Sequence, residues 1–180
     1  MASEYIVEAH SRLYFQDIAW QIRGQLGLEN QVYFPIVETL DWLSLIYGFT
    51  YEIVEDGTLP PFMPADMNPE TGEIRLENYV YCGAATANGT HRMTITHEFA
   101  HYITLCYLGF KWHKNDTDEE VPAYCSPEWQ AKCLAGELLV PFKLTQHMSC
   151  EEIMETCVVS REAAVYQYYQ IHKEDLKMNQ

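Results

Sequence analysis

Positive charge is scarce in this sequence. Its 180 residues include 11 Lys and Arg against 26 Asp and Glu, which gives a formal net charge of -15. The deficit runs along the whole chain, since no third of it is basic. Clusters of Lys and Arg bind nucleic-acid backbones and anionic membrane surfaces. The composition therefore argues against direct nucleic-acid binding and against docking on a membrane.

Long apolar runs and targeting signals are lacking as well. The start of the chain has neither the positive charge nor the apolar core of a secretory signal. The uncharged, apolar-looking stretch at 99–110 is too short to cross a bilayer. The six cysteines include no C-x-x-C pair, which argues against cysteine-ligated zinc and redox chemistry. We expect a cytoplasmic protein with reduced, mostly buried thiols.

The sequence does contain enough apolar residues for a single packed domain, which covers 1–180. Apolar residues make up 48% of the chain and aromatic residues 13%, which argues against intrinsic disorder. Apolar periodicity, caps and alternation predict helices at 11–27, 35–48, 91–108, 127–140, 150–157 and 160–171, and strands at 50–55 and 73–77.

The sequence also predicts which residues cap two of these helices, how deeply one helix is buried and where one strand lies in its sheet. Thr90 is expected to cap the helix at 91–108, and Ser126 the helix that begins at 127. The helix at 35–48 is apolar enough to be buried on more than one side. The strand at 73–77 is interpreted as an edge strand that could pair with an extended substrate.

One motif points to chemistry. His97-Glu98-Phe99-Ala100-His101 is an H-E-x-x-H pattern inside a predicted helix. Residues four apart lie on one helix face, so both imidazoles can reach a single metal ion. Glu98 lies about a quarter-turn away, where its carboxylate can reach a water rather than the metal. Neutral imidazole nitrogen is a good zinc ligand, so His97 and His101 are expected to bind Zn2+ and Glu98 to act as the catalytic base.

A catalytic zinc site needs a third protein ligand, and the residues alone leave its identity open. The chain has Thr104 and Tyr107 where the longer metzincin signature has glycine and histidine, so that class is excluded. Glu128, 27 residues after His101, starts a helix able to pack against the first one, and a rigid helix suits a ligand better than a loop. An acid at a helix start also needs no metal to explain it. The downstream candidates are His113, the acids at 116–120, Glu128 and Glu137.

Three stretches carry a resemblance to a known family. They are Met93-Thr-Ile-Thr-His-Glu-Phe-Ala-His101, then Glu128-Trp-Gln-Ala-Lys-Cys-Leu-Ala-Gly-Glu-Leu-Leu-Val-Pro141, and Cys157-Val-Val-Ser-Arg-Glu-Ala163. Together they resemble the ImmA/IrrE family of small metallo-endopeptidases, found beside repressors of phages and mobile elements. The second stretch is similar to the family's E-x-x-A-N-x-F-A-A-x-L-L-M-P. The chain departs from that pattern at Lys132 for Asn, Leu134 for Phe, Gly136 for Ala and Val140 for Met.

The resemblance implies a fold, a ligand set and a substrate. The fold would be α+β, a helix-rich zincin-like domain with a small, mostly antiparallel sheet and a C-terminal helical segment. The acid that opens the second motif is the family's third zinc ligand, a position that Glu128 occupies. The implied activity is zinc-dependent cleavage of a protein, a helix-turn-helix repressor encoded nearby. Lys132 favours the alternative, a poorly active anti-repressor module that keeps the zinc and acts by protein contact.

Other functional assignments stay open from sequence. Arg92, Tyr102, His113 and Tyr124 are the candidates to stabilise an oxyanion, and sequence does not rank them. The C-terminal helices at 150–157 and 160–171 have the outline of a helix-turn-helix but no basic face, so packing or partner contact is favoured over DNA binding.

Overall fold

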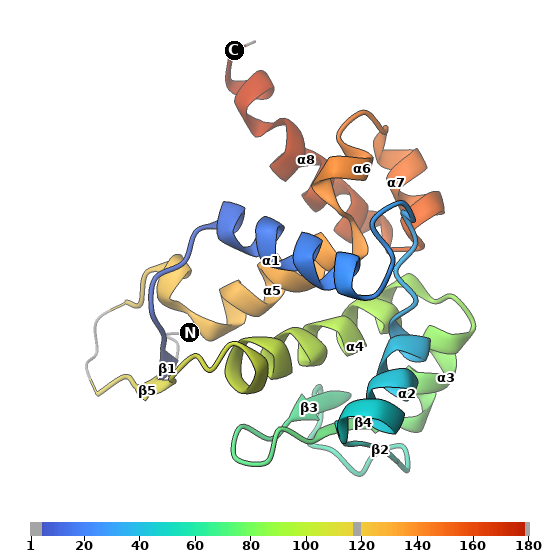
Figure 1. The fold of residues 1–180 in the computed structure, drawn as a ribbon, viewed down its shortest axis with the longest axis vertical. Coiled ribbons are helices and arrows are strands. Elements are labelled where there is room, and N and C mark those ends of the chain that lie inside the picture. Colours follow the sequence, from blue (N-terminus) through green and yellow to red (C-terminus); the bar gives the residue numbers. More distant parts are fainter. Residues whose placement is uncertain (1–4, 117–119, 179–180) are drawn as a thin grey trace.

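Helices α4 (Gly89–Tyr102) and α5 (Pro127–Leu139) pack against each other at the centre of the fold (Figure 1). The computed structural model describes residues 5–116 and 120–178. The other helices are α1 (Arg12–Gln25), α2 (Ile36–Tyr47), α3 (Asn78–Ala85), α6 (Phe142–Thr145), α7 (Cys150–Cys157) and α8 (Arg161–Met178), with a π-helix η1 (Ile103–Tyr107) and a 3-10 helix η2 (Ala123–Cys125). The strands are β1 (Tyr5–Ile6), β2 (Tyr51–Val54), β3 (Ala65–Met67), β4 (Ile74–Glu77) and β5 (His113–Lys114). The predicted helix-rich α+β class is confirmed.

The larger sheet covers one flank of α4. Its strand order is β2-β4-β3, with β2 parallel and β3 antiparallel to β4, and β1 pairs separately with β5 in antiparallel fashion. The strand predicted at 73–77 is therefore central, and its interpretation as an edge strand is wrong. Its backbone groups are already paired on both sides, so it cannot add a substrate strand. The strand that contacts α4 most is β3, an edge strand for which the sequence gives no prediction.

Helix ends follow the predicted capping chemistry with one correction. The Ser126 side chain accepts a hydrogen bond from the Trp129 amide, as predicted for the start of α5. At α4 the cap is Asn88 rather than Thr90, because the Asn88 side chain accepts from the amides of Thr90 and His91. Helical structure continues beyond Tyr102 as η1, so the predicted helix at 91–108 is an α-helix joined to a π-helix.

Helix α2 is less buried than its composition suggested. Its first turn enters the core, but its second half points outward, with exposed fractions of 41% for Trp42, 86% for Leu45, 57% for Ile46 and 69% for Tyr47. The expectation of burial on more than one side is therefore wrong for the second half of the helix. A large exposed apolar surface of this kind marks an interaction site more often than a solvated one.

Two fully buried arginines hold the irregular segment before α2. Arg92 of α4 donates to the carbonyl oxygen of Phe34 and to the Tyr33 hydroxyl, and Arg23 of α1 donates to the carbonyl oxygen of Gln31. Burial lowers the pKa of both guanidinium groups, to about 10 for Arg23. Backbone carbonyls that no strand or helix uses are satisfied in this way.

A buried ion pair joins α1 to α5. Arg12 lies 2.9 Å from the Glu137 carboxylate, and the two side chains are 10% and 3% exposed. Arg12 also donates to the side-chain oxygen of Gln167 on α8. Gln167 in turn lies against Gly136, where a Cβ would overlap its amide nitrogen. These contacts fasten the C-terminal helix α8 to the central pair.

All six cysteines are unpaired, but only Cys133 and Cys157 are buried, so the expectation of mostly buried thiols is wrong. None of the described helices combines the length and the apolar character needed to cross a membrane.

Candidate metal centre

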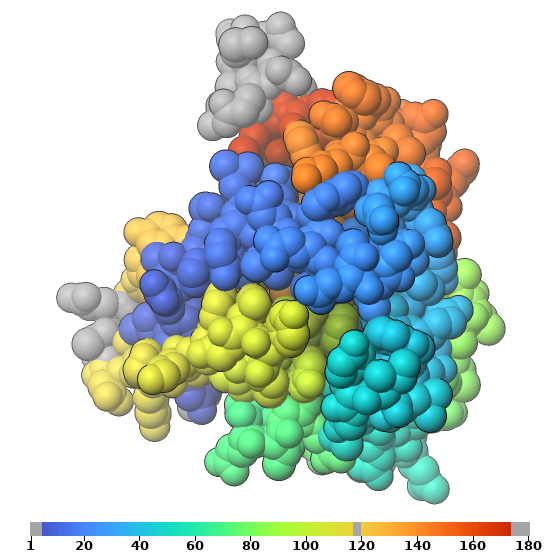
Figure 2. Space-filling model, in the orientation of Figure 1, coloured from blue at the N-terminus to red at the C-terminus, as the bar shows by residue number. Residues whose placement is uncertain are grey.

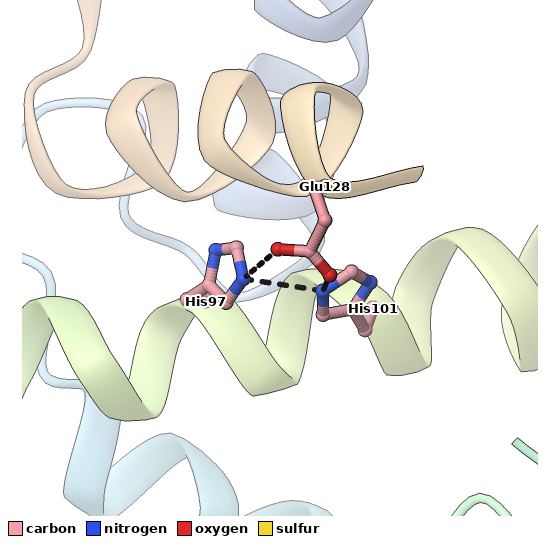
Figure 3. A group of neighbouring side chains, drawn as sticks. All are labelled: His97, His101 and Glu128. Atoms are coloured by element: carbon pink, nitrogen blue, oxygen red, sulfur yellow. Dashed lines mark hydrogen bonds and ion pairs between the residues drawn. The ribbon is translucent and has the colours of Figure 1, made fainter. Parts of the chain in front are cut away.

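Three side chains from two helices meet in one cluster (Figure 3). His97 and His101 extend from α4, and Glu128 reaches between them from the first turn of α5. The two Nε2 atoms lie 3.1 Å apart. Oε2 of Glu128 lies 3.3 Å from His97 Nε2, and Oε1 lies 3.2 Å from His101 Nε2. Two imidazole nitrogens and a carboxylate at this spacing can hold a metal ion.

Local structure explains why these side chains converge. The four-residue spacing of the histidines places both on the α4 face that meets α5. Ser126 caps α5 and Pro127 occupies its first position, which fixes the direction in which the helix starts. Glu128 is then in the first turn, where the helix dipole also favours a carboxylate.

The electrostatics of the cluster suit a cation. Hydrogen bonds from His101 and His97 hold the pKa of the Glu128 carboxyl far below its usual range, so the group is ionised near neutral pH. His101 is almost fully buried, while the Glu128 side chain is 60% exposed. The cluster is therefore open to solvent on the Glu128 side and closed on the His101 side. Three protein donors with an open side are typical of a metal site that leaves a position for water or substrate.

The second ring nitrogen of His101 lies inside the protein. This Nδ1 atom is buried and has no hydrogen-bond partner among the described residues. Metal-ligating histidines usually donate their other ring N–H to a carboxylate, carbonyl or water, which orients the ring. Trp112 packs edge-on against the His101 ring, at 5.4 Å between ring centroids, and this contact restricts the orientation of the imidazole. Lys132, one helical turn beyond Glu128, is exposed.

Glu98 has the electrostatic character of a proton carrier. Burial raises the pKa of its carboxyl to about 7, and the nearby His97 opposes part of that increase. A group that titrates near neutrality can both accept and release a proton under working conditions. Perturbed carboxylates of this kind gather at functional sites.

The structure separates the candidates for a third ligand. Glu137 is buried in its ion pair with Arg12, away from the histidines. His113 is exposed in β5, where it pairs with Ile6. Asp116 is exposed and outside the cluster, and residues 117–119 of the acidic run lie outside the described residues. Among the described candidates, Glu128 is the one that meets both histidines.

The four candidate oxyanion donors lie in different parts of the fold. Arg92 is fully buried and donates to the carbonyl oxygens of Val158 and Phe34, so it cannot face a substrate at the cluster. Tyr102 packs against Phe49 on another side of α4. Tyr124 and His113 are exposed, and the described contacts do not join either to the cluster. These placements remove Arg92, and the oxyanion donor stays unassigned.

Two features of the site could not be predicted from the sequence. Trp112 follows Gly109 in a loop, and nothing in its local sequence indicates that its ring would pack on His101. Asp66 of β3 is near enough to contribute to the raised pKa of Glu98, an effect that depends on the pairing of β3 with β4. Both contacts are tertiary, and a linear motif carries no signal for them.

Comparison with known proteins gives a fold likeness. No protein-family profile matches the chain, and no curated protein matches it significantly. Among solved structures, it is similar to a Mycobacterium tuberculosis transcriptional regulator, with a TM-score of 0.54 and 12% sequence identity. The match covers 87% of this chain and 47% of that one. At this identity, the likeness concerns the fold alone.

Proposed function

We propose that this chain is a cytoplasmic zinc-dependent endopeptidase. The observation that carries the proposal is that Glu128, from a separate helix, meets the two histidines of an H-E-x-x-H motif while Glu98 stands beside them with a pKa of about 7. A cluster serving only to fasten two helices would have no need of Glu98. The resemblance to ImmA/IrrE peptidases suggests the substrate, a helix-turn-helix repressor encoded nearby.

His97, His101 and Glu128 would hold the zinc. When bound, Zn2+ supplies Lewis-acid polarisation of the scissile carbonyl and makes water more acidic. Glu98 accepts the proton of the attacking water and then delivers it to the leaving amine. The buried flank of the cluster around His101 and Trp112 limits access of bulk water to the histidines.

The test replaces the proposed base without removing a ligand. Glu98→Gln is expected to keep one zinc per chain by elemental analysis and to lower repressor cleavage by about 100-fold or more, the contribution typical of general acid–base catalysis. Glu155→Gln, an exposed acid on α7, is the matched control and should cleave normally. Adding a chelator should stop the wild-type reaction. Cleavage by Glu98→Gln at the wild-type rate would disprove the assignment of the base.

One observation favours a second candidate function. Lys132, exposed one turn after Glu128, stands where the resembled pattern has Asn, a change close to a proposed metal ligand. The alternative is an anti-repressor module that binds zinc and acts by protein contact. It predicts that the repressor is inactivated by wild type and Glu98→Gln alike, with no fragments on a denaturing gel.

A further inference from the structure

The second half of α2 forms an exposed apolar surface next to a cavity. We call Trp42, Leu45, Ile46 and Tyr47 the α2 patch; all four are at least 41% exposed. Beside it lies a cavity of about 370 Å³ between α1, α2 and the end of α4. Its lining includes Trp42 and Tyr47 from the patch, Ile22 of α1 and the following Leu26, and Phe99 and Ile103. Figure 2 shows the blue end of α1, the yellow-green segment after α4 and the teal end of α2 meeting on one face.

The cavity has the size and chemistry to receive a large apolar side chain. None of the described residues that line it is charged. Polar groups are confined to a few positions, among them Gln25 and the Tyr107 hydroxyl, which lie 3.5 Å apart. A pocket for an apolar anchor beside exposed aliphatic and aromatic side chains is the usual composition of the centre of a protein interface.

The chain segment that contains α2 carries charge of one sign. From Gly24 to Ile74 the sequence has no Lys or Arg and nine Asp and Glu. Glu38 and Asp41 precede Trp42 and Leu45 by one helical turn, so they flank the patch on the same helix. The guanidinium groups of Arg23 and Arg92, which lie nearby in the fold, are fully buried and give no positive surface.

This surface is separate from the metal cluster. Phe99 and Ile103 face the cavity, whereas His97 and His101 face α5. At about 100° per residue, these two pairs lie on roughly opposite sides of the α4 axis. Occupation of the cavity therefore leaves the cluster open.

We propose that the α2 patch and its cavity are a docking site for a partner protein segment that combines a large apolar anchor with flanking Lys or Arg residues. The anchor enters the cavity between α1, α2 and α4, and the basic residues meet Glu38 and Asp41 at the start of the patch. A second copy of this chain is a poor occupant, because it would bring an equally acidic surface, with a net charge of -15 per chain, against this one. A nucleic acid is disfavoured for the same reason.

The experiment uses a library of random 16-residue peptides displayed on phage and selected on the full chain. The selected peptides are then synthesised and their affinities measured by fluorescence anisotropy. The test variant is Leu45→Ser/Ile46→Ser, which changes two exposed residues and no charge. Leu13→Ser, in an α1 residue that is 70% exposed and outside the cavity lining, is the matched control. Circular dichroism verifies that both variants are folded.

The expected result is enrichment of peptides with Trp, Phe or Leu next to Lys or Arg. They should bind the patch variant at least 10-fold more weakly than wild type, and the control like wild type. Exchange of Glu38 and Asp41 for Gln and Asn should reduce both the affinity and its salt dependence. Absence of enrichment, peptides without basic residues, or equal binding to the patch variant would overturn the proposal. So would sedimentation showing a micromolar dimer that the patch variant abolishes, since the surface would then be a self-interface.

Discussion

Glu128 connects the two helices of the candidate metal centre through a single side chain. Its carboxylate is the one group that approaches both His97 and His101 from α5, at 3.2–3.3 Å. Because it is largely exposed, replacing it removes a donor without opening a cavity in the core. Substitution of Glu128 therefore tests the metal cluster without a simultaneous loss of core packing.

We predict that Glu128→Ala weakens zinc binding at least 100-fold with little change in the free energy of unfolding of the metal-free chain. Loss of groups that only support a ligand already costs about 10- to 100-fold in affinity, and loss of a ligand should cost more. Competition against a chromophoric chelator measures the affinity. Glu151→Ala, an exposed acid on α7, serves as control. Unchanged zinc affinity in Glu128→Ala would remove this residue from the ligand set.

At the residue scale, the sequence predicted the side-chain contacts that depend on helical spacing alone. His97 and His101 lie four residues apart on one helix, so their convergence needs no tertiary information. Glu128 needed the family resemblance to stand out from His113 and Glu137, because its position depends on how α5 packs on α4. Contacts such as the Trp112 ring on His101 arise between segments without a shared pattern, and they became visible only in the structure.

At the scale of elements, a nearly buried ion pair joins α1 to α5. Arg12 and Glu137 are nearly buried, and burial raises the pKa of the Glu137 carboxyl although Arg12 opposes the increase. Removing one partner leaves the other charge buried, whereas replacing both by apolar residues leaves no unpaired charge of this pair.

We therefore predict that Arg12→Met lowers the free energy of unfolding by about 3–5 kcal/mol, and that adding Glu137→Met recovers part of the loss, since Gln16 and Gln167 still lose their hydrogen bonds to the pair. Urea unfolding of the wild type, both single variants and the double variant gives the coupling energy. Additive effects of the two substitutions would show that the pair does not act as a unit.

The order of elements was easier to predict than their packing. Caps and proline positions located the start of α5 because these signals act within a few residues. The central place of β4 and the exposed end of α2 could not be predicted, since alternation and apolar content describe a segment but not its neighbours. The π-helix after α4 also lacks a local signature, because Gly109 marks only where helical structure stops.

For the whole molecule, a bound metal would fasten the central pair of helices. The ligands come from α4 and α5, which pack together in the middle of the fold. A ligand that binds only the folded state stabilises it by about 2.7 kcal/mol at 100 times its Kd. We predict that zinc at this excess raises Tm by roughly 5–11 °C over chelator-treated protein, given the response expected for a chain of this size. Calorimetry of His97→Ala should show no zinc-dependent shift, and an equal shift in that variant would place the stabilising zinc elsewhere.

The net charge of -15 gives a second prediction at this scale. An acidic protein attracts the basic surface of a DNA-binding substrate over long distances, and salt screens that attraction. We predict that kcat/KM for repressor cleavage falls several-fold between 50 and 300 mM NaCl, while cleavage of a short uncharged peptide containing the same scissile bond changes little. A rate for the repressor that is independent of ionic strength would leave the charge with a role in solubility alone.

The close approach of Gly136 to Gln167 has a consequence for how this sequence can change over evolutionary time. A Cβ at 136 would lie 1.7 Å from the Gln167 amide nitrogen, so alanine there requires the end of the Gln167 side chain to move. The same side chain accepts a hydrogen bond from Arg12, so substitutions at 136 and 167 act on one shared contact. The effect of alanine at 136 therefore depends on which residue stands at 167, because a shorter side chain there leaves room for the added methyl group.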